Sequence, residues 1–128
     1  MQLTARFVAR SIAAGRVLYG VACMAAPKVM LGPGGFRTEG PAVWMVRAFG
    51  VRDVVLGSGT LMALAEPSVA NARRWVGLSA AADGADVANA LLFRKDLDRT
   101  GMIGALAIAV PAATAGAWAA NGLYADES

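Results

Sequence analysis

Near its C-terminal end the chain has no charged residue between Arg99 and Asp126, and this run limits the possible folds more than any other feature. It is longer than the ~20 residues that an α-helix needs to cross the hydrocarbon core of a bilayer. Three further apolar stretches of similar length precede it. We therefore expect four membrane spans, at residues 11–31, 42–65, 75–93 and 102–120.

The composition agrees with a small membrane protein. Hydrophobic residues make up 57% and charged residues 16% of the 128 residues, whereas an average soluble domain has roughly 25% charged residues. This length fits a single domain, residues 1–128, and is too short for a two-domain enzyme. The apolar excess also argues against a disordered chain.

Several classes of partner and chemistry are disfavoured by the ionisable residues. The net charge of +3 is spread along the chain and not gathered in one stripe, so we expect no nucleic-acid partner. The chain has no His and one cysteine, Cys23, which argues against a zinc site, a Ser-His-Asp triad and an internal disulfide. We expect no metal and no cofactor.

Helix breakers separate the apolar stretches. Pro27 and Pro33 follow the first, Pro41 stands where the second would begin, and Pro67 follows its end. Short connections between helices rich in small residues favour an all-α, up-down four-helix transmembrane bundle. Arg16 interrupts the first apolar stretch, which favours a retained helix over a cleaved signal peptide. We expect a multi-pass protein of the cell (cytoplasmic) membrane, surrounded by the lipid bilayer, with both termini on one side.

Orientation in the membrane stays open, because the basic residues near the span ends are almost evenly divided. Four arginines lie on one side, and five lysines and arginines lie on the other. The positive-inside rule therefore decides nothing here.

Six charged residues fall within the expected spans: Arg16 in the first, Arg47, Arg52 and Asp53 in the second, and Asp83 and Asp86 in the third. Each would cost roughly 2.5–3.5 kcal/mol at a helix centre. Three positive and three negative charges balance, so we expect them to pair inside the bundle.

Helical spacing indicates how these residues are arranged. Asp83, Asp86 and Asn89 follow one another at steps of three residues and form a polar stripe. Arg47 is close enough to its helix start to reach the interface, so Arg52 and Asp53 are the better partners for the two acids. The candidate intramembrane polar site comprises Arg16, Arg47, Arg52, Asp53, Asp83, Asp86 and Asn89.

Two segments carry a resemblance to a known family: Arg47-Ala-Phe-Gly-Val-Arg-Asp53, followed by Leu56-Gly57, and Ala82-Asp83-Gly84-Ala85-Asp86. With the Arg-Val-Leu-Tyr-Gly stretch of the first span, they resemble a family of small actinobacterial four-helix membrane proteins, a domain of unknown function. A looser similarity links the chain to the DoxX-like membrane proteins. The resemblance implies a membrane bundle and transfers no catalytic residue.

Three functions are compatible with the sequence. In the first, the polar site lines a pocket for a small lipophilic ligand or substrate. The aspartates would then be available as acid or base groups, so enzymatic activity is an open question. Alternatively, the protein is an accessory or assembly subunit whose ion pairs are purely structural, or an oligomeric proton-coupled transporter.

A partner surface is expected on the last span. Ala105, Ala109, Ala113 and Ala117 form a small-residue stripe at steps of four residues. Such stripes allow membrane helices to approach closely, so we expect self-association or binding of a membrane partner through this span.

Overall fold

The computed structural model describes residues 4–125, and helices make up 88% of the structure. These residues contain no strand, which confirms the all-helical fold class. Four helices are long: α1 Ala5–Ala25, α3 Pro41–Ala65, α4 Val69–Leu92 and α5 Arg99–Ala125. Three segments are short: α2 Pro27–Leu31, η1 Gly32–Gly34 and η2 Arg94–Asp96.

The bounds of α1 correct the first expected span, 11–31. The helix begins at Ala5 because the Thr4 side chain caps it and accepts a hydrogen bond from the Phe7 backbone N–H, at 3.2 Å. It ends at Ala25, because the residue before Pro27 is forced out of the helical conformation. The chain then turns into the separate helix α2.

Helix α4 also begins six residues before the expected start at residue 75. Ser68 is the reason, because its hydroxyl accepts a hydrogen bond from the Ala70 backbone N–H at 3.3 Å and caps the helix at Val69. The capping residue lies directly after Pro67, so the α3–α4 connection is very short.

Three helices are long and apolar enough to cross a membrane: Ala5–Ala25, Pro41–Ala65 and Arg99–Leu123. They indicate a membrane protein. The stretch expected as the third span lies in α4, which is not one of them. That helix carries four charged residues, namely Arg73, Arg74, Asp83 and Asp86.

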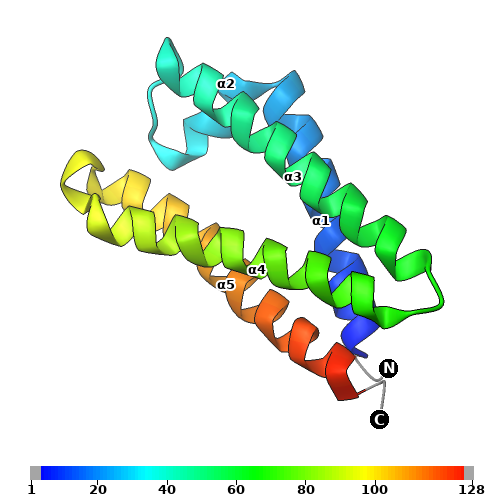
Figure 1. The fold of residues 1–128 in the computed structure, drawn as a ribbon. Coiled ribbons are helices and arrows are strands. Elements are labelled where there is room, and N and C mark those ends of the chain that lie inside the picture. The colour runs from blue at the N-terminus through cyan, green and yellow to red at the C-terminus, as the bar shows by residue number, and fades with distance from the viewer. Residues whose placement is uncertain (1–3, 126–128) are drawn as a thin grey trace.

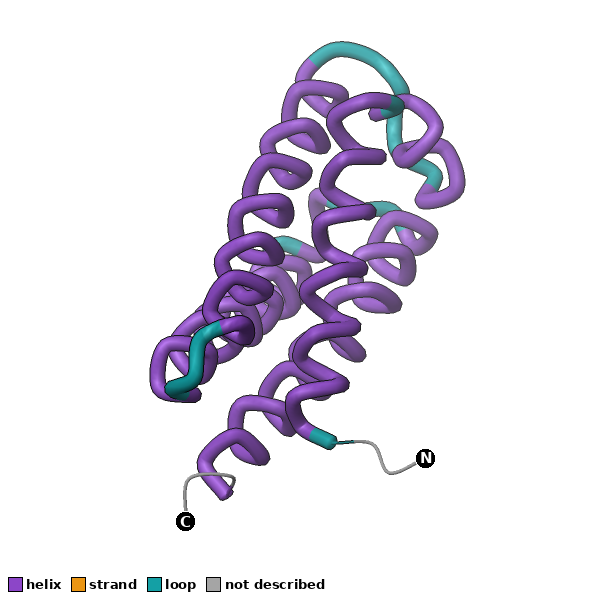
Figure 2. Tube along the Cα trace, turned by 90° about the vertical axis from the view of Figure 1, so that its right-hand side faces the viewer, coloured by secondary structure: helices purple, strands orange, loops and turns teal. Residues whose placement is uncertain are grey.

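The long helices associate mainly as two pairs, α1 with α3 and α4 with α5 (Figure 1). The pairs meet where α1 begins and α5 ends, and a Cβ atom placed at Gly122 would lie 2.6 Å from the Cβ of Ala5. They diverge toward the other end, where the turn after η1 reaches α5 at Thr100. Figure 2 shows the helices as purple coils joined by teal loops.

Buried residues recur along α1, α3 and α4 at alternating steps of three and four, the spacing of knobs-into-holes packing. We call these positions the core seam. Many are small, so backbones touch: a Cβ atom at Gly50 would lie 2.6 Å from the carbonyl oxygen of Gly20. The seam comprises Ala9, Ala13, Arg16, Gly20 and Cys23 of α1, Val46, Gly50, Asp53, Gly57 and Thr60 of α3, and Val69, Ala72, Val76, Ser79 and Asp83 of α4.

Candidate functional site

Arg16 lies at the centre of the charged cluster, on the core seam of α1. Its Nη1 donates to Asp53 Oδ1 of α3 at 2.9 Å, and its Nη2 donates to Asp83 Oδ2 of α4. The same Nη2 donates to the Ser79 carbonyl oxygen at 3.3 Å. One guanidinium group therefore connects three helices.

Arg52 forms the second half of the cluster. Its Nη1 and Nη2 donate to the two carboxylate oxygens of Asp86 at 2.9 and 2.8 Å, which is a bidentate ion pair. Nη2 also lies 3.4 Å from Asp53 Oδ1, and the guanidinium carbon lies 5.0 Å from the centre of the Phe49 ring. Asp53 thus joins both arginines into one chain of ion pairs, Asp83–Arg16–Asp53–Arg52–Asp86.

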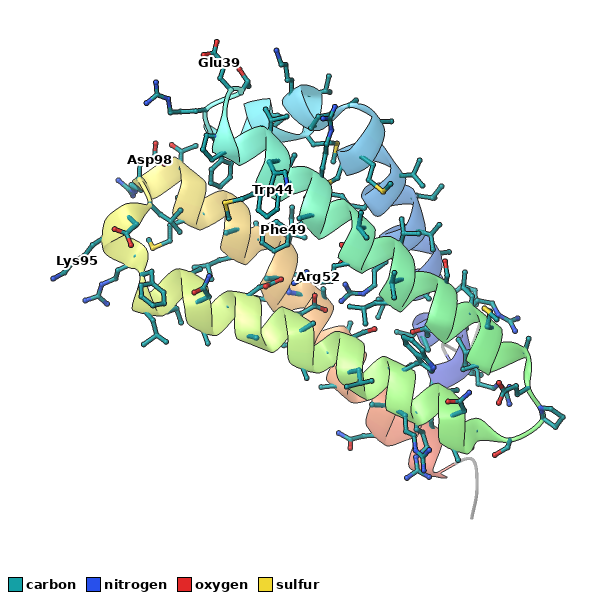
Figure 3. All side chains as sticks on the ribbon, turned by 45° about the horizontal axis from the view of Figure 1, so that its top comes forward. Glu39, Trp44, Phe49, Arg52, Lys95 and Asp98 are labelled. Carbon is teal, nitrogen blue, oxygen red and sulfur yellow. The ribbon has the colours of Figure 1, made fainter. Side chains whose placement is uncertain are left out.

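The chain of ion pairs runs from the core to the surface. The side chains of Arg16 and Asp83 are 7% and 6% exposed, whereas those of Arg52 and Asp86 are 32% and 33% exposed. Figure 3 shows Phe49 and Arg52 in the space between α3 and the α4–α5 pair. The Arg52–Asp86 end of this chain of ion pairs is therefore accessible from outside the protein.

The expected pairing of Arg52 with one of the two acids of α4 is confirmed. Arg52 does not bond to both, because Asp83 bonds to Arg16. The sequence predicted that Arg16 pairs inside the bundle but named no acidic partner for it, whereas in the structure it is the central cation, paired with Asp53 and Asp83.

Arg47 and Asn89 lie outside the cluster. Both are exposed, and neither shares an ion pair with it. Each lies about 120° around its helix from the buried acid on that helix, at 100° per residue. For Asn89, two steps of three residues drift by about 60° each away from Asp83. The expected balance of three against three charges is therefore wrong, because two arginines face three aspartates.

Two residues of the site were not predicted from the sequence. Thr60 and Ser79 line a small cavity beside Arg16 and Asp83, and Ala112 and Gly116 of α5 also line it. The cavity leaves about 10 Å³ for the centre of a water molecule, which is room for about one water molecule. The buried Ser79 Oγ and Arg16 Nε atoms have no hydrogen-bond partner. Ser79 lies four residues before Asp83, and Thr60 lies seven residues after Asp53. Both therefore follow the spacing of the core seam, and this spacing is the signal that could have predicted them.

Among residues 4–125, no group of three or more His, Cys, Asp or Glu side chains could hold a metal ion. The charged groups that form the described cluster are the guanidinium groups of Arg16 and Arg52 and the carboxyl groups of Asp53, Asp83 and Asp86. No family model, curated protein or solved structure matches this chain.

Proposed function

We propose that this protein binds a small lipophilic molecule through a polar group that rests on the Arg52–Asp86 pair. The observation that carries the proposal is the partial exposure of this pair, about one third of each side chain, in the middle of a helix suited to cross a membrane. Arg52 lies 11 residues after Pro41 and 13 before Ala65.

A charged pair at this depth is unfavourable next to lipid tails. Ionisable residues inside membranes face other protein groups, a water-filled cavity or a ligand. An oxygen of the ligand would meet the exposed part of the Arg52 side chain, while Asp86 keeps its two bonds from the guanidinium.

The surroundings favour a ligand with an apolar body. The Phe49 ring, 41% exposed, lies beside the Arg52 guanidinium. A molecule seated there would touch this ring while its oxygen-containing group meets Arg52. An enzymatic step would be limited to proton transfer by the carboxyls, and the proposal does not require one.

The test compares what remains bound to purified protein by native mass spectrometry. We expect wild-type protein to retain a small lipophilic molecule that Arg52→Gln loses. Arg47→Gln is the matched control, since it removes the same charge from an exposed position on the same helix. Equal retention by all three proteins would contradict the proposal.

An accessory subunit is the second candidate, and the same exposed pair favours it. A polar side chain of a partner helix would pair with the exposed part of the Arg52 and Asp86 side chains as well as a ligand does. In that case, protein purified under mild conditions carries a partner protein, and Arg52→Gln releases the partner and no small molecule.

We also propose that all four long helices cross the cell membrane as an up-down bundle. Helix α4 has 24 residues, which is about 36 Å at 1.5 Å per residue and enough for a bilayer core. Its two acids are paired with arginines of α1 and α3, so their charges are compensated within the protein. This architecture agrees with the small four-helix membrane proteins that the sequence resembles.

A further inference from the structure

The charged cluster contains one carboxyl group more than it has cations. From α1 it is faced by Arg16, with Tyr19 and Cys23 nearby, and from α3 by Arg52 and Asp53. Helix α4 contributes Asp83 and Asp86. Helix α5 contributes only Ala112 and Gly116, which do not ionise. With every acid ionised and the phenol and thiol neutral, the cluster would carry one uncompensated negative charge.

Such a charge is costly at the buried end of the cluster, where the side chains of Arg16 and Asp83 are 7% and 6% exposed. A carboxyl group removes the cost by keeping its proton. The bonds of the three acids show which one is least stabilised as an anion. Asp53 has both arginines next to it, and Asp86 accepts two N–H bonds from Arg52.

Asp83 accepts from only one N–H group, Nη2 of Arg16, and it is the most buried of the three acids, at 5% exposure. It also borders the one-water cavity. Ser79, a residue that is 6% exposed, borders the same cavity, and its hydroxyl has no hydrogen-bond partner. A cavity of this size, bordered by the polar groups of Arg16, Ser79 and Asp83, is suited to hold a water molecule.

We propose that Asp83 is a proton-binding site, which holds a proton in the folded protein and thereby makes the cluster neutral. The Asp83 hydroxyl donates to one water molecule in the cavity, and this water also bonds to Ser79 Oγ. When the proton leaves, the core gains one negative charge at the contact between α1 and α4. The site does not depend on a ligand at the Arg52–Asp86 pair.

Infrared spectroscopy of the full chain in lipid nanodiscs tests this proposal, because a neutral carboxyl group absorbs separately from a carboxylate. We expect wild-type protein at neutral pH to show a neutral-carboxyl band that Asp83→Asn removes. Glu66→Gln is the matched control, since Glu66 is an exposed acid outside the cluster, and it should leave the band unchanged. Asparagine has nearly the shape of a protonated aspartate, so Asp83→Asn is expected to fold.

A second variant tests the charge count independently. Arg52→Gln leaves one arginine against three acids, so we expect a stronger neutral-carboxyl band than in wild type. Absence of the band from wild-type protein at neutral pH would overturn the proposal, as would a band that Asp83→Asn leaves intact. A wild-type protein that lacks the band but is stabilised against heat by Na⁺ or K⁺ would hold a cation instead, which also overturns it.

Discussion

At the scale of single residues, glycines determine how closely α1 and α3 approach and therefore whether Arg16 reaches Asp53. A Cβ atom at Gly57 would lie 2.6 Å from the Ala13 carbonyl oxygen and 2.8 Å from Cγ2 of Val17. The first neighbour is backbone and cannot move without shifting α1. The Arg16–Asp53 bond thus depends on the lack of a side chain at Gly57, one helical turn after Asp53.

Replacing Gly57 tests this close approach. We expect Gly57→Ala to lower the free energy of unfolding by roughly 1–3 kcal/mol, the range for overpacked contacts. Gly77→Ala is the control, since no atom lies within 4 Å of its added Cβ, and it should be neutral or stabilising by up to about 1 kcal/mol. Thermal unfolding in detergent measures both. Equal effects would show that the two helices have room between them.

Arg16 is the residue on which the buried half of the cluster depends. Arg16→Gln would remove a bond from Asp53 and the only guanidinium bond of Asp83. Breaking a buried ion pair in this way costs roughly 3–5 kcal/mol, which denaturant or thermal unfolding would show. Arg10→Gln, at an exposed position of the same helix, should stay within about 0.5 kcal/mol of wild type. A small effect at Arg16 would mean that the cluster does not stabilise the fold.

At the scale of helices, the sequence predicts which segments are helical better than it predicts which faces are buried. The apolar runs locate α3 to within one residue. The first and third spans were predicted to start six residues too late, because the capping residues Thr4 and Ser68 begin α1 and α4 earlier. The role of Arg16 was missed for another reason. Spacing along one helix shows which of its residues share a face, but not which residues of another helix oppose them. The polar residues are therefore the sequence's main signal for the core seam. Arg47 and Asn89 misled the prediction, because they do not follow the spacing of that seam.

Helix α4 decides the topology, because a fourth crossing returns the chain to its starting side. If α4 spans the membrane, reporters fused to the N- and C-terminus should lie on the same side. If α4 lay along the surface, the three remaining crossings would place the termini on opposite sides. Reporters that are active on only one side of the membrane distinguish these outcomes, and opposite sides would rule out the four-span bundle.

The expected small-residue stripe on α5 is divided in the structure. Ala109 is buried, whereas Ala117 is exposed. We therefore expect Ala109→Leu to destabilise the fold. By contrast, Ala117→Leu should leave the fold intact and weaken self-association, which size-exclusion chromatography with light scattering would measure. An unchanged mass for Ala117→Leu would show that α5 carries no contact between copies at this position.

At the scale of the whole molecule, membrane integration has a direct test. We expect the protein to stay with the membrane pellet after alkaline carbonate treatment and to dissolve only with detergent. The three span candidates bury only 17–33% of their apolar windows inside the protein, which leaves most of that surface to lipid. Release by carbonate alone would contradict the membrane assignment.

The two helix pairs carry unequal shares of the cluster's charge, and this matters while the chain is being synthesised. The pair α1 and α3 supplies two arginines and one aspartate, and the pair α4 and α5 supplies the other two aspartates. Because the N-terminal pair leaves the ribosome first, its two arginines are opposed by one acid of the cluster until α4 follows. Neither half is electrically complete alone.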